Sequence, residues 1–138
     1  MARPSTLAVE ARWLGRYRCR VRARQFIVEV DEPAESGGDD AGPQPTELFL
    51  GSLASCFALA VGHVAAKRSI ELVAVDVTAV GRYDGPRFDA IRLEVRVDPV
   101  DPETDVDLLL GRARAVCYVS NTLALGPDLE VVRVDAER

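Results

Sequence analysis

The first thirty residues alternate apolar and polar side chains in short runs, a pattern typical of β-strands. Residues 6–13 form one run, and Gly15 and Arg16 predict a turn after it. The next run alternates strictly. Its apolar members are Tyr17, Cys19, Val21 and Ala23, and its charged members are Arg18, Arg20, Arg22 and Arg24. Because a period of two is that of a half-buried antiparallel strand, and residues 25–30 make a third run, the pattern predicts an N-terminal β-meander.

A polar loop and a long apolar helix are predicted next. Residues 31–45 are rich in glycine, proline and acids, which predicts a loop without regular structure, of a length that is often functional. From Pro45 to Lys67 apolar residues recur at helical spacing, and Pro45 and Glu47 suit a first helical turn. Since this helix is apolar most of the way round, we expect it to be buried in the middle of the molecule.

The second half of the chain predicts a hairpin, a helix and a last strand. Residues 72–83 and 88–98 alternate on either side of a turn at Asp84, Gly85 and Pro86. Asp101 as N-cap and Pro102 as first helical residue predict a second helix that ends near Cys117. Residues 129–134 predict a final strand. With no internal repeat, the pattern favours one α+β domain over residues 1–138.

Composition and charge narrow the function classes. The chain has 138 residues, a formal net charge of −5 and a pI near 4.9, which argues against a nucleic-acid partner despite the arginine-rich strand. No apolar run approaches the roughly 20 residues that cross a bilayer, and no signal peptide is visible. We therefore expect a cytoplasmic protein without a membrane partner. Three cysteines are an odd number, unsuited to a closed disulfide framework, so we expect any cysteine chemistry to be reactive rather than architectural.

Two cysteines are the candidate reactive groups. Cys56 lies inside the predicted central helix, and Cys117 lies 61 residues further on. This separation fits neither a zinc-binding C-x-x-C pair nor a thioredoxin-like motif, and His63 alone does not complete a metal site, so that no metal or cofactor is expected. Taken alone, a cysteine in an apolar helix is most often a small hydrophobe. We expect Cys19 and His63 to be packed side chains.

Two segments resemble the OsmC/Ohr family of osmotically inducible and organic hydroperoxide resistance proteins: GPQPTELFLGSLASC at residues 42–56 and CYVSNTL at residues 117–123. The resemblance implies an α+β fold built as an intertwined homodimer, in which sheets wrap around long central helices and two active sites lie at the subunit interface. It also implies a thiol peroxidase that reduces organic hydroperoxides and is itself reduced by a dithiol, typically on a lipoylated protein.

The same resemblance implies roles for individual residues. Cys56 corresponds to the peroxidatic cysteine and Cys117 to the resolving one. Arg16, which follows a glycine in the first β-turn, corresponds to the arginine that contacts the thiolate, and Glu47 to the glutamate that holds it. Glu47 is one residue closer to the cysteine than in the peroxidase members, and Tyr118 replaces their proline.

The chemistry of a thiol peroxidase requires a cation near Cys56. Attack on a peroxide needs a thiolate, whereas a free cysteine has a pKa near 8.5. Because Cys56 lies too far along its helix for the N-terminus to lower this pKa alone, a guanidinium is expected beside it. Oxidised Cys56 would then condense with Cys117 to a disulfide. The alternative is a non-catalytic dimeric module of the same fold, for binding or for a redox-stress response, with Cys56 sealed among aliphatic side chains.

Overall fold

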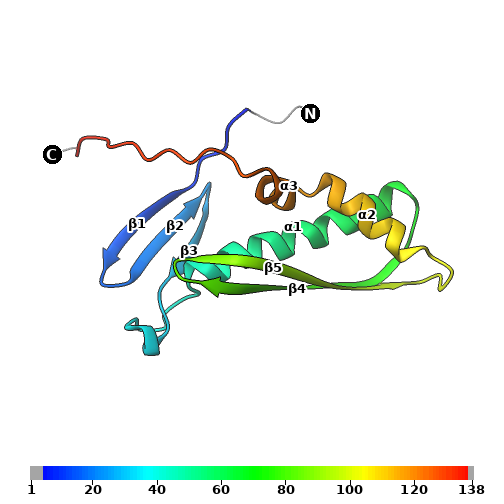
Figure 1. The fold of residues 1–138 in the computed structure, drawn as a ribbon, viewed down its shortest axis with the longest axis horizontal. Coiled ribbons are helices and arrows are strands. Elements are labelled where there is room, and N and C mark those ends of the chain that lie inside the picture. The colour runs from blue at the N-terminus through cyan, green and yellow to red at the C-terminus, as the bar shows by residue number, and fades with distance from the viewer. Residues whose placement is uncertain (1–4, 137–138) are drawn as a thin grey trace. The chain divides into compact units, whose positions relative to one another are not determined.

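The computed structural model describes residues 5–136 (Figure 1), and this part of the chain divides into two compact units, one ending at Gly51 and the other beginning at Ser52. Its elements are β1 (Glu10–Gly15), β2 (Arg18–Ala23), β3 (Phe26–Val30), the 3-10 helix η1 (Ala34–Ser36), α1 (Pro45–Lys67), β4 (Leu72–Asp84), β5 (Arg87–Pro99), α2 (Val106–Val116) and α3 (Tyr118–Leu125). The predicted α+β class is confirmed. One domain over the whole chain stays a prediction.

The first unit contains the predicted β-meander. Strands β1, β2 and β3 form an antiparallel sheet in that order. The turn between β1 and β2 is tight, since Gly15 and Arg16 both adopt positive φ angles of 112° and 47°. The Trp13 indole N–H donates to the Arg16 carbonyl oxygen at 3.0 Å, which closes this turn. The first strand begins at Glu10, later than the sequence pattern suggested.

One buried carboxylate organises the loop after β3. Asp31 is 1% exposed, and it accepts backbone N–H hydrogen bonds from Glu32 at 2.8 Å, Asp39 at 3.2 Å and Ala41 at 3.1 Å. Residues Ala34–Ser36 form a short 3-10 helix, so the prediction of a wholly irregular loop is wrong there. The loop is therefore a closed structure around Asp31 that leads the chain into α1.

Glycine is required where this loop packs on itself. A Cβ atom on Gly38 would overlap the backbone carbonyl of Glu32, and one on Gly42 would overlap that of Glu29. A backbone carbonyl cannot move aside as a flexible side chain can, so only glycine allows these close approaches.

The pKa of Asp31 lies below its ordinary value of 3.8. Burial raises the pKa of this carboxyl, but the hydrogen bonds from Ala41, Glu32 and Asp39 and the positive charge of Arg18 outweigh burial. Because the folded pKa is depressed, the carboxylate contributes its full stability above the pKa of the unfolded chain. That contribution is lost as the pH falls through the folded pKa.

We expect Asp31→Asn to lower the stability of the protein at pH 7 and to flatten its acid dependence below about pH 3.8. An amide nitrogen cannot accept the N–H bonds that one carboxylate oxygen now receives. The measurement is urea unfolding against pH, followed by the fluorescence of Trp13, the single tryptophan of the chain. The exposed neighbour Asp40 supplies the control Asp40→Asn. An Asp31→Asn variant whose acid profile overlays that of the wild type would contradict this account.

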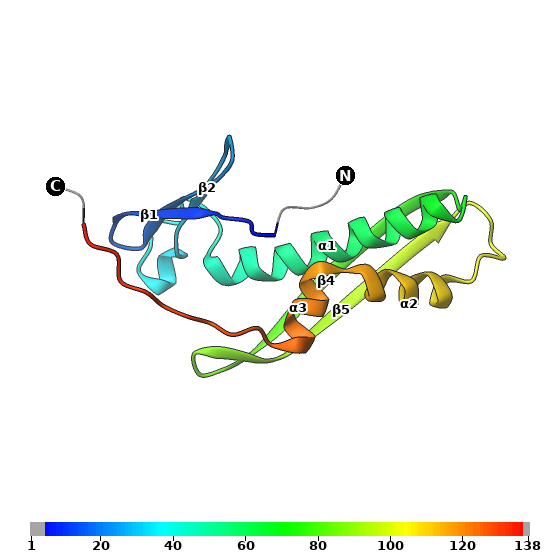
Figure 2. The same cartoon turned by 90° about the horizontal axis from the view of Figure 1, so that it is seen from above.

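The second unit is built on the β4–β5 hairpin, and α1 and α2 cover one of its faces (Figure 2). The strands pair antiparallel from Leu72 with Pro99 to Asp84 with Arg87, with a register shift near each end, which confirms the predicted hairpin. The alternate residues Ile91, Leu93, Val95 and Val97 are half-buried, and all but the first pack against the buried helix residues. The core of this unit is therefore a contact of two helices with one sheet face.

The central helix has its predicted bounds, but it is buried along one side only. Its buried residues are Leu53, Phe57, Ala60, Val61, Val64 and Ala65. Leu59 is 75% exposed, and His63 is exposed too, which corrects the expectation of a packed histidine. The reason is geometric, because the hairpin and α2 of this unit cover only part of the helix surface.

The expectation that no segment is apolar and long enough to cross a membrane is wrong as stated. By length and composition alone, Pro45–Lys67 could do so. A core helix of a folded domain gives the same pattern, and this helix contributes six buried residues to the core.

The C-terminal half differs from the prediction in three ways. Helix α2 starts at Val106 with Asp105 as N-cap, because Asp105 accepts from the Leu108 N–H at 3.0 Å, whereas Asp101 caps a separate turn. A third helix, α3, follows Cys117 and was not predicted. Residues 129–134 are exposed and form no strand, since within residues 5–136 no neighbouring strand pairs with them.

Candidate active site

Cys117 occupies a break between two helices. It is the C-cap of α2 and the N-cap of α3, with an extended backbone of φ −77° and ψ 113°. The Asn121 amide donates to the Ala115 carbonyl oxygen at 3.1 Å, and the Asn121 N–H donates to the Cys117 carbonyl oxygen at 3.1 Å. These bonds hold the break on both sides. The Cys117 side chain is fully buried, with its sulfur at the N-terminal end of α3.

The second unit brings Cys56 and Cys117 together. Cys56 lies in the middle of α1, is half-buried and packs against the core that contains Cys117. Its thiol lies within hydrogen-bonding reach of the Cys117 sulfur, and both cysteines are free. Two thiols 61 residues apart in the chain are therefore neighbours in the fold, which is the arrangement that disulfide formation requires.

The surroundings of Cys117 favour its thiolate. Burial raises the pKa of this thiol, but hydrogen bonds from the Ser120 side chain and N–H, from the Cys56 thiol and from the Val119 N–H together bring the pKa below its ordinary value of 9.0. Backbone N–H groups at a helix N-terminus also carry partial positive charge, which acts in the same direction. These groups therefore stabilise the thiolate form of Cys117.

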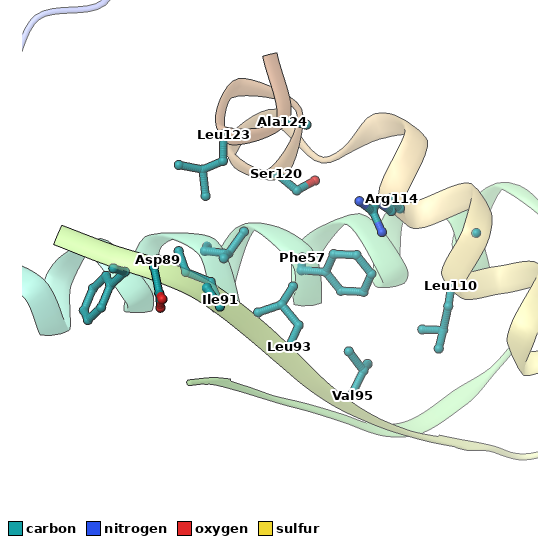
Figure 3. A pocket seen from close by; sticks show the side chains of 14 residues that line it. Phe57, Asp89, Ile91, Leu93, Val95, Leu110, Arg114, Ser120, Leu123 and Ala124 are labelled. Carbon is teal, nitrogen blue, oxygen red and sulfur yellow. The ribbon is translucent and has the colours of Figure 1, made fainter. Parts of the chain in front are cut away.

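The second unit also has an open, largely apolar groove of about 730 Å³ (Figure 3). Phe57 from α1, Leu93 from β5 and Leu123 from α3 contribute to its apolar lining. Neither cysteine lines the groove, but Ser120 does, and Ser120 also contacts the Cys117 sulfur. The groove can hold an apolar organic group.

Two charged side chains also line the groove. Figure 3 shows Arg114 extending from α2 on the side of Phe57 and Ser120, whereas Asp89 lies on β5 at the other end. Arg114 stands three residues before Cys117, and Ser120 stands three residues after it. Neither residue was predicted from the sequence to belong to the site. Their spacing from Cys117 was the available signal, but it could be used only once the helix break was known.

The other two predicted site residues lie in the first unit. Arg16 donates to Asp39 at 3.3 Å and to the Gly37 carbonyl oxygen at 3.0 Å. Glu47 accepts from the Gln44 N–H at 3.0 Å, which caps the first turn of α1. The two side chains therefore have partners other than each other. The roles of Arg16 and Glu47 toward Cys56 stay predictions.

Residues 5–136 contain no group of three or more histidine, cysteine, aspartate or glutamate side chains that could hold a metal ion. The third cysteine, Cys19, is a half-buried residue of β2 that pairs in register with Trp13 and Val30. It belongs to the first unit and is not a member of the pair described above.

Comparison with known proteins agrees with the fold described here. The family model of the OsmC-like proteins matches residues 37–132. An OsmC-like protein from Mycoplasma pneumoniae is similar in structure, with a TM-score of 0.74, 18% identity and coverage of 87% of this chain and 88% of that one. No curated protein matches the sequence.

Two further structural neighbours have names that state a biological role. An organic hydroperoxide resistance protein OsmC from Legionella pneumophila has a TM-score of 0.63 and 22% identity, and the match covers 88% of this chain and 91% of that one. An organic hydroperoxide resistance protein from Elizabethkingia anophelis has a TM-score of 0.63 and 24% identity, with 88% and 90% covered. At these identities the neighbours show the shared fold.

Proposed function

This chain belongs to the OsmC-like protein family, and from that premise we propose that it is a thiol peroxidase that reduces organic hydroperoxides with Cys56 and Cys117. The observation that carries the proposal is the contact of these two thiols, and it is supported by an open apolar groove that is lined by Ser120, a neighbour of the Cys117 sulfur. Relatives of the same fold are named organic hydroperoxide resistance proteins, which agrees with this chemistry.

Burial supports Cys56 as the peroxidatic cysteine. Cys117 is fully buried, whereas Cys56 is half-buried, so a peroxide has access to Cys56 first. The Cys56 thiolate attacks the terminal peroxide oxygen, the O–O bond breaks, and the departing alkoxide takes up a proton and leaves as the alcohol. Cys56 becomes a sulfenic acid. The Cys117 thiolate then attacks that sulfur, the S–O bond breaks, the departing hydroxide takes up a proton to give water, and a disulfide forms. A dithiol, as on a lipoylated protein, returns the pair to the reduced state.

The groove supports an organic rather than an inorganic peroxide. Its lining by Phe57, Leu93 and Leu123 is suited to burying an apolar substituent, which hydrogen peroxide lacks. On the resemblance to the peroxidase members, Arg16 remains the proposed cation for the Cys56 thiolate and Glu47 its proposed partner, although Arg16 bonds to Asp39 and Gly37 in this structure. Arg114 is a second guanidinium that the groove itself offers.

One equivalent of cumene hydroperoxide is expected to join Cys56 to Cys117 in a disulfide. Peptide mapping by mass spectrometry under non-reducing conditions identifies the bridge. In Cys117→Ser the sulfenic acid on Cys56 should persist and react with dimedone, because its partner is gone. A bridge to Cys19, or a chain that leaves the hydroperoxide unreacted, would contradict the proposal.

We also propose that the protein acts as a homodimer in the cytoplasm. Large apolar side chains are exposed on the single chain, and in the C-terminal segment they include Leu129, Val131, Val132 and Val134. A second copy that supplies a strand to pair with this segment would bury them. Analytical ultracentrifugation is expected to give twice the mass of the 15.0 kDa chain, and a monomer at micromolar concentration would refute this part.

The alternative is a non-catalytic dimeric module of the same fold, for binding or for a redox-stress response. One observation favours it, since Arg16 is engaged by Asp39 and by the Gly37 carbonyl oxygen within its own unit. A module of this kind would not consume hydroperoxide. The mapping experiment therefore separates the two functions.

A further inference from the structure

We infer that the disulfide has a fixed polarity: the reducing thiol attacks the sulfur of Cys56, Cys117 is the leaving group, and Ser120 is the positioning residue that stabilises its departure. This reduction step belongs to a catalytic cycle only if the proposed function is correct. The structural basis of the inference is that the two sulfurs have different environments. The inference concerns how the disulfide is reduced and not how Cys56 attacks the peroxide.

Access to the two sulfurs differs. Cys117 is fully buried between α2 and α3, while Cys56 is half-buried on α1. Thiol–disulfide exchange needs an approach along the S–S axis to the sulfur under attack, so that access decides which sulfur reacts. A reductant that enters from solvent therefore meets Cys56.

The two sulfurs also differ in how well their surroundings stabilise negative charge, and this difference too favours Cys117 as the leaving group. The Cys117 sulfur faces the N–H groups of Val119 and Ser120 at the start of α3 and the Ser120 hydroxyl. These donors stabilise negative charge on sulfur, and the better-stabilised thiolate leaves faster. Cys56 lies within the body of α1, whose backbone N–H groups are used by the helix itself.

Ser120 can respond to the redox state of its neighbour. Its hydroxyl lies 3.3 Å from the Cys117 carbonyl oxygen and also within reach of the Cys117 sulfur. A serine has one hydroxyl proton, so it donates to one of these acceptors at a time. The charge that appears on sulfur when the disulfide breaks makes the sulfur the stronger acceptor, so the hydroxyl turns toward Cys117 as it leaves.

The disulfide is reduced in two thiol–disulfide exchange reactions. A thiolate of the reductant attacks the Cys56 sulfur, the Cys56–Cys117 bond breaks and its electron pair stays on Cys117. The products are a mixed disulfide on Cys56 and a Cys117 thiolate. The second thiol of a dithiol reductant then attacks its own sulfur in the mixed disulfide, which releases Cys56 as thiolate and the reductant as a cyclic disulfide.

The polarity is tested by trapping the mixed disulfide. The purified chain is oxidised with diamide, treated briefly with the monothiol cysteamine, quenched in acid and mapped by mass spectrometry. We expect cysteamine on Cys56 over Cys117 by at least about tenfold. Equal labelling, or an excess on Cys117, would overturn the inference.

The role of Ser120 is tested by Ser120→Ala, with Thr122→Ala as the matched control. Thr122 is on the same helix and donates its hydroxyl to the Tyr118 carbonyl oxygen at 2.7 Å, so its loss perturbs α3 without touching the Cys117 sulfur. Ser120→Ala should slow reduction by cysteamine about tenfold and shift the dithiothreitol equilibrium toward the disulfide by a similar factor. Ser120→Thr keeps the hydroxyl and should restore both values. If both alanine variants change these values equally, Ser120 is merely structural.

The pKa of Cys117 gives a further readout. Ser120→Ala should raise the pKa of Cys117, measured by thiolate absorbance in a Cys56→Ser background, whereas Thr122→Ala should leave it in place. An unchanged pKa in the Ser120→Ala variant would remove Ser120 from the proposal.

Failure of this inference can be told apart from failure of the proposed function. Diamide forms the disulfide without a hydroperoxide, so trapping on Cys56 in a chain that does not react with cumene hydroperoxide would reject the peroxidase alone. Trapping on Cys117 in an active peroxidase would reject the polarity alone. If diamide does not join the two cysteines, the polarity is overturned, because it requires their contact.

Discussion

Cys56→Ser is expected to lower the turnover of cumene hydroperoxide by at least about a thousandfold, whereas Cys19→Ser retains the turnover of the wild type. A serine hydroxyl is a far weaker nucleophile than a thiolate at neutral pH, and within the second unit Cys56 is the thiol of the pair that a substrate can approach. Cys19 belongs to the first unit, so its loss leaves the cysteine pair intact. The measurement is the rate of peroxide consumption with dihydrolipoamide as reductant.

The same assay distinguishes the two cysteines of the pair. Cys117→Ser should still consume the first equivalent of hydroperoxide, but should then accumulate sulfinic acid on Cys56 over repeated cycles because no disulfide protects it. A Cys56→Ser variant with wild-type turnover would reject Cys56 as the nucleophile and, with it, the proposed function.

Leu109→Ala is expected to lower the free energy of unfolding by about 2–5 kcal/mol, the range for removing a large buried aliphatic side chain. Leu109 is 1% exposed and belongs to the core that α1, α2 and the hairpin share. Its truncation leaves a cavity where α2 meets α1, because packed helices relax only in part. Urea unfolding followed by far-ultraviolet circular dichroism measures the loss.

Leu108→Ala is the matched control. Leu108 is the preceding residue of the same helix, and it is 46% exposed. The two substitutions change helix propensity equally, so the difference between them isolates burial. We expect Leu108→Ala to cost less than about 1 kcal/mol. Equal losses for the two variants would mean that α2 does not use Leu109 to pack on α1.

The elements that were predicted correctly have strong local periodicity. The hairpin alternates over two long strands, and α1 keeps a helical spacing over 23 residues, so neighbouring residues alone define each element. Helix α3 escaped prediction because eight residues with no buried member give little periodic signal. Residues 129–134 show the opposite case, since they have a strand pattern but no strand beside them within the described residues.

The start of α2 shows how local signals compete. Asp101 followed by Pro102 is a good helix start, yet Asp105 offers a second N-cap four residues later. The later start places Leu109 and Ala113 against α1, and Asp101 stabilises a turn instead. Burial of the two apolar residues outweighs the local preference, because packing contributes more to a helix than capping does.

For the candidate site, the family segments around Cys56 and Cys117 were recognisable from residue order alone. The α+β class followed from the strand and helix periods, and the reactive residue type followed from the chemistry of cysteine. Both are local properties of the chain. The contact of the two thiols, the burial of one of them, the helix break at Cys117 and the positions of Ser120 and Arg114 required the folded structure. These depend on how α1, α2 and α3 pack, and packing is a matter of distances between residues far apart in the chain, which no local pattern encodes.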